Sequence, residues 1–179
     1  FLFSRKPAKY AKKTRCLMEL KTKVHAEDGK HELVITREFD LPVDLLFTAH
    51  AEPELFEKWM SHEYGTTTVL KFEARKHGGW QLQTVDAEGN VLFGANGAFH
   101  DFVPNRRITR TFEMDDSAYG VQLEFLEFEP LSDDTSKLTI HTIFRSPEFR
   151  DELLKMPFAF GLSMAHDRLQ EIAGKLRKN

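Results

Sequence analysis

The feature that most constrains the fold is a change of period in the hydrophobic pattern at Pro147. Before it, between residues 66 and 144, apolar and polar residues alternate, as they do in strands with one buried face. After it, apolar residues recur at the spacing of a helix of about five turns. The apolar face of so long a meander has to be covered, and only this last helix is long enough. We therefore expect an α+β fold in which a curved antiparallel sheet of about six to seven strands wraps around a long C-terminal helix.

The connections at the start of the chain follow from turn chemistry. Residues 18–39 predict a hairpin that turns at Asp28-Gly29, because Asp-Gly is a preferred two-residue turn. Pro42 ends the second strand of this hairpin. Two short helices in series are expected next, at about residues 43–47 and 53–60, each with a proline near its first turn.

Two strands depart from simple alternation. Leu123 and Phe125 alternate with polar neighbours, but the phase shifts near Leu126 and Phe128, which predicts a β-bulge. The long strand over residues 91–103 is rich in glycine and alanine. Small residues inside a strand predict a bend or the close approach of another backbone.

The composition favours a large apolar interior. The chain has 16 Phe residues against three Tyr, and Phe brings apolar area without a polar group. Such a chain either has a full core or lines an apolar cavity. Its 179 residues correspond to one ordinary domain, which we expect to span residues 18–179. No segment has the length of a membrane span or the character of a secretory signal, and Cys16 alone forms no internal disulfide, so we expect a cytoplasmic protein.

The positive charge is unevenly distributed along the chain. Residues 1–17 contain six of the 25 Lys and Arg residues and none of the 28 Asp and Glu residues. A basic arm of this kind binds nucleic acid or anionic lipid in some proteins. We favour the alternative that Met18 is the native start and that residues 1–17 are an upstream segment. The acidic remainder of the chain argues against a nucleic-acid binder, which usually has a basic face.

The sequence offers little support for catalysis or for a cofactor. There is no nucleophile motif of the type G-x-S-x-G and no glycine-rich phosphate loop. The histidines show no H-x-x-x-H spacing, so we expect no metal site. The eight of them are His25, His31, His50, His62, His77, His100, His141 and His166.

Four short motifs follow one another along the chain. They are residues 35–42 (ITREFDLP) with a P-E-L element and Trp59 after them, the Gly-Gly-Trp turn at 78–80, residues 102–108 (FVPNRRI), and residues 167–169 (DRL). This order resembles the START-like superfamily. Within it, the chain resembles the heat-shock-protein-90 ATPase activator homologue-like family, close to the polyketide-cyclase (SRPBCC) group. The resemblance covers about residues 31–177 and implies the helix-grip fold.

The chain departs from the family pattern at four positions. Leu41 stands where the family usually has Ala, and Met60 stands where a second Trp is frequent. Asn105 replaces a Pro, and His166 lies where an apolar residue is usual. The family includes chaperone cofactors, ligand carriers and a few enzymes, so the resemblance does not by itself fix a function.

We expect a ligand site in the cavity between the sheet and the last helix. By alternation Arg110 faces this cavity, where it needs a partner: Glu127, Glu124 or an anionic group of a ligand. The bland alternative is a structural ion pair at Arg110 and a satisfied core-edge histidine at His166. Trp59, Trp80, Phe158 and Phe160 lie near element ends and are candidates for the cavity mouth. The full set of predicted ligand-binding residues is Trp59, Phe72, Trp80, Phe93, Arg110, Phe112, Phe125, Phe158, Phe160 and His166.

Three functions are compatible with these features. The first is non-enzymatic binding of a small apolar or amphipathic molecule in the cavity. The second is a chaperone cofactor that stimulates a heat-shock ATPase through its surface, which the resemblance implies. The third is a cyclase- or hydrolase-like enzyme, which would need converging titratable groups with perturbed pKa values. Both a monomer and a homodimer remain open.

Overall fold

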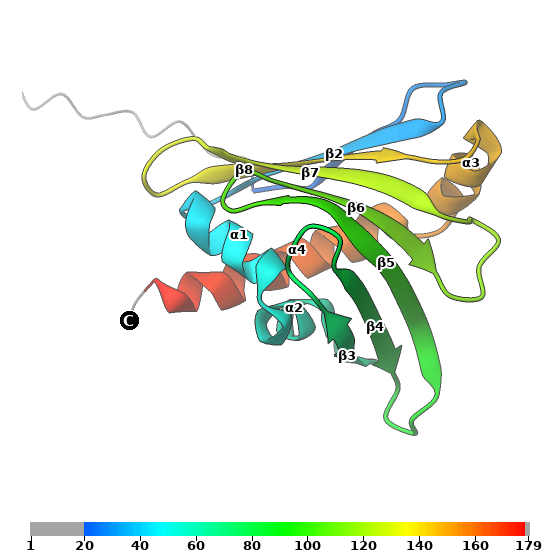
Figure 1. Ribbon diagram of the computed structural model, residues 1–179, viewed down its shortest axis with the longest axis horizontal. Coiled ribbons are helices and arrows are strands. Elements are labelled where there is room, and N and C mark those ends of the chain that lie inside the picture. The colour runs from blue at the N-terminus through cyan, green and yellow to red at the C-terminus, as the bar shows by residue number, and fades with distance from the viewer. Residues whose placement is uncertain (1–19, 178–179) are drawn as a thin grey trace, which may run out of the picture.

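The fold is built on one antiparallel sheet, and the predicted helix-grip architecture is confirmed (Figure 1). The computed structural model describes residues 20–177, so the N-terminal arm, Cys16 and Met18 lie outside the described residues. The strand order across the sheet is β1-β2-β8-β7-β6-β5-β4-β3. The strands are β1 (Lys23–His25), β2 (Glu32–Phe39), β3 (Thr66–Phe72), β4 (Gly79–Val85), β5 (Val91–Val103), β6 (Arg107–Met114), β7 (Gln122–Pro130) and β8 (Ser136–Ile143).

Four helices accompany the sheet. They are α1 (Val43–Ala51), α2 (Pro53–Met60), α3 (Pro147–Lys155) and α4 (Phe158–Leu176). The long helix α4 runs along the concave side of the sheet and packs against the other three helices (Figure 1). Proline stands at the start of α2 and α3, where its missing N–H leaves no helical hydrogen bond unmade. None of the helices within residues 20–177 has the length and hydropathy that a membrane span requires.

The core lies between the concave face of the sheet and the C-terminal part of α4. On β2 the side chains alternate strictly, so that Leu33, Ile35, Arg37 and Phe39 are buried. Strand β8 pairs with β2 over its whole length and buries its own alternate residues in the same layer. Burying large apolar side chains in this way contributes about 1.5–3 kcal/mol for each of them.

The bend of the sheet depends on close backbone contacts in β5. A β carbon at Gly97 would lie 1.9 Å from the carbonyl oxygen of Thr111 on β6, so no larger residue fits there. The same carbonyl accepts a hydrogen bond from the indole N–H of Trp80 at 3.2 Å. The register of β5 against β6 also shifts between Phe99 and Asp101, which increases the local twist. The predicted close approach at this small-residue strand is therefore present.

Two details differ from the sequence-based expectation. The sheet has eight strands, because the start of the predicted hairpin forms the three-residue strand β1 and pairs with β2. The bulge expected near Leu126 is absent, since β7 pairs without a register shift from Gln122 to Pro130. As a result Leu126 and Phe128 are buried on the concave face, whereas Phe125 belongs to the opposite face.

Side chains of α2 protect the free edge of the sheet at β3. The backbone N–H of Val69 donates to Glu57 Oε1 at 2.7 Å, and the N–H of Thr67 donates to Ser61 Oγ at 2.9 Å. Figure 1 shows α2 beside this edge. An unpaired strand edge is a template for pairing with a second chain. Helix α2 therefore blocks edge-to-edge association at this side of the sheet.

Replacing Glu57 with Leu should expose this edge. The N–H of Val69 loses a charged acceptor, so we expect the free energy of unfolding to fall by about 1–3 kcal/mol and self-association to increase. Urea denaturation and analytical ultracentrifugation measure the two effects. Glu57→Gln retains an acceptor oxygen and should behave nearly as the wild type. Equal losses in both variants would show that the carboxylate does not act by capping the strand.

Candidate functional site

A pocket opens at the end of the sheet where α3 meets the loop between β6 and β7. Its volume is about 500 Å³, within the range of small-molecule sites. The lining combines apolar and aromatic side chains with three carboxylates and includes no Lys or Arg. The lining residues are Met114, Asp116, Ser117, Ala118, Tyr119, Glu148, Phe149, Glu152 and Met156.

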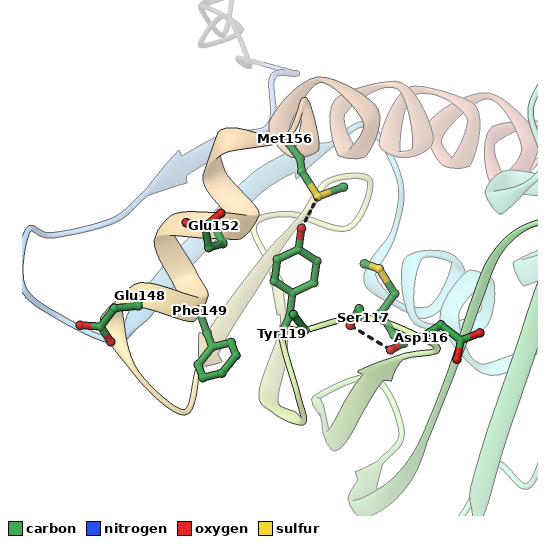
Figure 2. A pocket seen from close by; sticks show the side chains of 9 residues that line it. Asp116, Ser117, Tyr119, Glu148, Phe149, Glu152 and Met156 are labelled. Carbon is green, nitrogen blue, oxygen red and sulfur yellow. Dashed lines mark hydrogen bonds between the residues drawn. The ribbon is translucent and has the colours of Figure 1, made fainter.

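One hydrogen bond joins the two sides of this pocket. The hydroxyl of Tyr119, from the β6–β7 loop, donates to the sulfur of Met156, which lies between α3 and α4, at 2.7 Å. Figure 2 shows this contact across the pocket, with Phe149 facing the same space and Glu148 and Asp116 pointing outwards at its edge. A thioether is a weak acceptor and the pair is exposed. The connection across the pocket is therefore weak.

The pocket continues along the concave face through β6. Met114 lines it, and by alternation Phe112 and Arg110 lie on the same face, successively deeper. The guanidinium carbon of Arg110 lies 5.0 Å from the ring centre of Trp80 and 6.0 Å from that of Phe112. Arg110 Nε donates to Glu124 Oε2 at 2.7 Å. Of the carboxylates that the sequence left open, Glu124 is thus the partner.

A second buried arginine fastens α4 to the sheet. Arg37 of β2 is 3% exposed, and its Nη2 lies 2.7 Å from Asp167 Oδ1 on α4. Its guanidinium also lies over the ring of Phe39 at 5.1 Å. Next to it, His166 Nδ1 and Thr22 Oγ1 are 2.9 Å apart and share a hydrogen bond. The neighbourhood of His166 is therefore a structural anchor between β1, β2 and α4.

Two histidines are buried in the apolar interior and stay neutral. Burial lowers the pKa of His50 on α1 to about 4, against the opposing effect of its hydrogen bond with the Leu46 carbonyl and with the help of the Arg110 charge. Burial likewise lowers the pKa of His166 to about 3, with smaller contributions from His50 and Arg37. Neither side chain lines the open pocket. Their perturbed pKa values follow from burial in a packed core.

Comparisons with known proteins agree with this architecture. Residues 40–174 match the model of the family described as activator of Hsp90 ATPase homolog 1-like protein. The chain belongs to this family. Similar solved structures include proteins of this helix-grip architecture from Rhodobacter sphaeroides (21% identity, 87% of this chain and 99% of that one, TM-score 0.78) and Mycobacterium smegmatis (19%, 85% and 96%, 0.75). A third comes from Nitrosomonas europaea (24%, 85% and 99%, 0.70). No curated protein sequence matches the chain.

The structure distributes the predicted site residues of this family member over several environments. Arg110, Trp80 and Phe112 come together on the concave face, and Phe93 lies beside Phe112 at 6.5 Å between ring centres. Phe158, near the start of α4, packs against the core. Whether these side chains touch a ligand stays a prediction.

Other predicted residues are placed elsewhere. Trp59 is buried and donates its indole N–H to the Ala49 carbonyl at 2.7 Å, so it is a core residue and not part of the mouth. Phe72 packs between Phe56 and Phe99 in the same core. Phe125 lies next to His141 on the convex face, so its expected place in the cavity is corrected. Phe160 is 69% exposed.

The pocket residues Tyr119, Phe149 and Met156 were missed by sequence reasoning. They come from a turn and from the short helix α3, neither of which shows a periodic pattern. Met114 was recognised as a strand residue but not as pocket lining. Within residues 20–177, no three His, Cys, Asp or Glu side chains are grouped as metal ligands would be.

The buried histidines predict a specific pH dependence. Unfolded histidine has a pKa near 6.5, so on acidification the unfolded state takes up protons before the folded state does. Stability is therefore complete above about pH 6.5 and falls between pH 6.5 and 4, by about 2 kcal/mol per histidine at pH 5. Urea denaturation at pH 7.5 and 5 measures this loss.

The variant His166→Gln should reduce the difference between the two pH values by about half. His100→Gln, at an exposed position, serves as the matched control and should leave the difference unchanged. An undiminished difference in His166→Gln would assign the acid sensitivity to other groups.

Proposed function

We propose that this protein binds a small apolar or amphipathic molecule without transforming it. The observation that carries the proposal is the pocket of about 500 Å³ that opens between α3 and the β6–β7 loop and continues at Met114 onto the concave face. Aromatic and Met side chains supply its apolar surface, and few polar groups lie behind it, as is typical of small-molecule sites. The fold that the chain shares with its family leaves this end of the sheet–helix grip open.

Filling the pocket from Met114 tests the proposal. Met114→Trp should abolish ligand-induced stabilisation, because the indole occupies the pocket floor, whereas Glu113→Trp adds the same ring on the other face of β6. Native mass spectrometry identifies a co-purifying molecule, and a thermal-shift screen with fatty acids, sterols and aromatic polyketides shows binding as a rise of several degrees in Tm. If wild type and Met114→Trp respond alike, the pocket is not the binding site.

A second candidate function is that of a chaperone cofactor. The family name points to the Hsp90 ATPase, and the start of α4 presents an exposed apolar surface made of Met156, Phe160 and Met164. Exposed apolar patches mark interaction sites in soluble proteins. The double variant Phe160→Ser/Met164→Ser should then lose any stimulation of a chaperone ATPase, while Met114→Trp retains it. Equal activity of the double variant and the wild type would exclude this surface.

A further inference from the structure

A band of polar side chains crosses the concave face behind the pocket. In the register of the sheet, Arg110 on β6 is opposite Glu124 on β7, and Glu124 is opposite Thr142 on β8. Gln122 pairs with Phe112 and lies one position closer to the pocket on the same face. Four polar residues are thus neighbours in a layer that is otherwise apolar. We call Arg110, Gln122, Glu124 and Thr142 the polar band.

The band contains hydrogen-bonding groups without a partner. Gln122 is 4% exposed and Thr142 is 2% exposed, and the side chain of neither forms a hydrogen bond with another described residue. Leaving a buried amide unpaired costs free energy, so native proteins almost always satisfy such groups. Within residues 20–177, Arg37 Nε is the side-chain atom that is both fully enclosed and unpaired. The Gln122 amide therefore remains accessible to a small group.

The charges of the band are already balanced. Arg110 and Glu124 form an ion pair at 2.7 Å, and their side chains are 14% and 13% exposed. The Nη groups of Arg110 and the Oε1 atom of Glu124 form no further hydrogen bond to a described residue. The band thus offers donors from Arg110, Thr142 and Gln122, and acceptors from Glu124 and Gln122. A charged ligand group would add an unbalanced charge to this low-dielectric layer, which is costly.

The rim of the pocket acts in the same direction against anions. Asp116, Glu148 and Glu152 surround the entrance and no Lys or Arg lines it. This negative field disfavours a carboxylate on its way in. A cation would be attracted to the rim, but farther in it would meet the Arg110 guanidinium. Neither sign of charge is therefore favoured along the whole path.

We propose that the bound molecule carries a neutral head group that both donates and accepts hydrogen bonds, such as a hydroxyl or a carboxamide, on an apolar body. The head group pairs with the Gln122 amide, the free Glu124 oxygen and the Arg110 Nη groups, while the body occupies the aromatic pocket. This inference rests on the proposed function, because it names the chemistry of the ligand for the same site.

Three probes with the same chain length test it: octanamide, octanoate and octylammonium at pH 7.5. Isothermal titration calorimetry gives their affinities, and tryptophan fluorescence reports on Trp80, which contacts Arg110. Octanamide should bind at least tenfold more tightly than either charged probe. Failure of all three to bind would contradict the proposed function itself. Equal binding of all three, or a preference for octanoate, would overturn the inference while leaving the function in place.

Two variants test the roles within the band. Gln122→Leu should weaken octanamide binding about tenfold without affecting octylammonium, and it should unfold at the same or a higher urea concentration, because it removes an unpaired amide. Glu124→Gln leaves the Arg110 charge unbalanced, so octanoate affinity should rise at least tenfold. Glu127→Gln on the opposite face of β7 is the matched control and should change neither. An unaltered preference in Glu124→Gln would show that the ion pair does not select the head group.

Discussion

One helix has to cover the concave face of an eight-stranded sheet, and it covers only part of it. The fully buried residues of α4 are Ala165, His166, Leu169 and Ala173, all beyond its first two turns. Towards its start, Phe158 and Leu162 are only partly buried and Phe160 is exposed. The mismatch between a broad curved sheet and a single cylinder leaves space at one end. The pocket lies at that end, so it follows from the same packing that forms the core.

The two ends of α4 are also fastened with different strength. Towards its middle and end, the buried Arg37 pairs with Asp167, Arg168 Nε donates to the Trp59 carbonyl at 3.0 Å, and the side chain of Gln170 bonds with the backbone of Asp40. Charge-assisted and buried contacts of this kind are costly to break. At its start the helix is held by the exposed bond between Tyr119 and Met156. Opening at the pocket therefore disturbs little of the core, and the rest of the grip remains closed.

Sequence reasoning predicted the architecture but assigned one strand to the wrong face. Alternation could be read correctly on β2 and β6, because each concave face there carries mainly apolar residues. On β7 the apolar Leu123 and Phe125 face outwards, while Gln122 and Glu124 face inwards, so the hydrophobic pattern indicated the opposite face and a bulge. The capping of Val69 by Glu57 and the pairing of Thr22 with His166 join segments that no local pattern connects. Such contacts follow from the tertiary arrangement alone.

The failure on β7 has a physical meaning. A sequence whose levels agree folds to one structure, and local disagreement marks positions where another requirement outweighs stability. Gln122 and Glu124 occupy a concave layer in which Leu126 and Phe128 of the same strand are buried normally. Apolar residues at these two positions would have been the more stable choice. The tight end of the grip supplies enough core to tolerate this cost, which allows the open end to carry polar groups that only a bound molecule would satisfy.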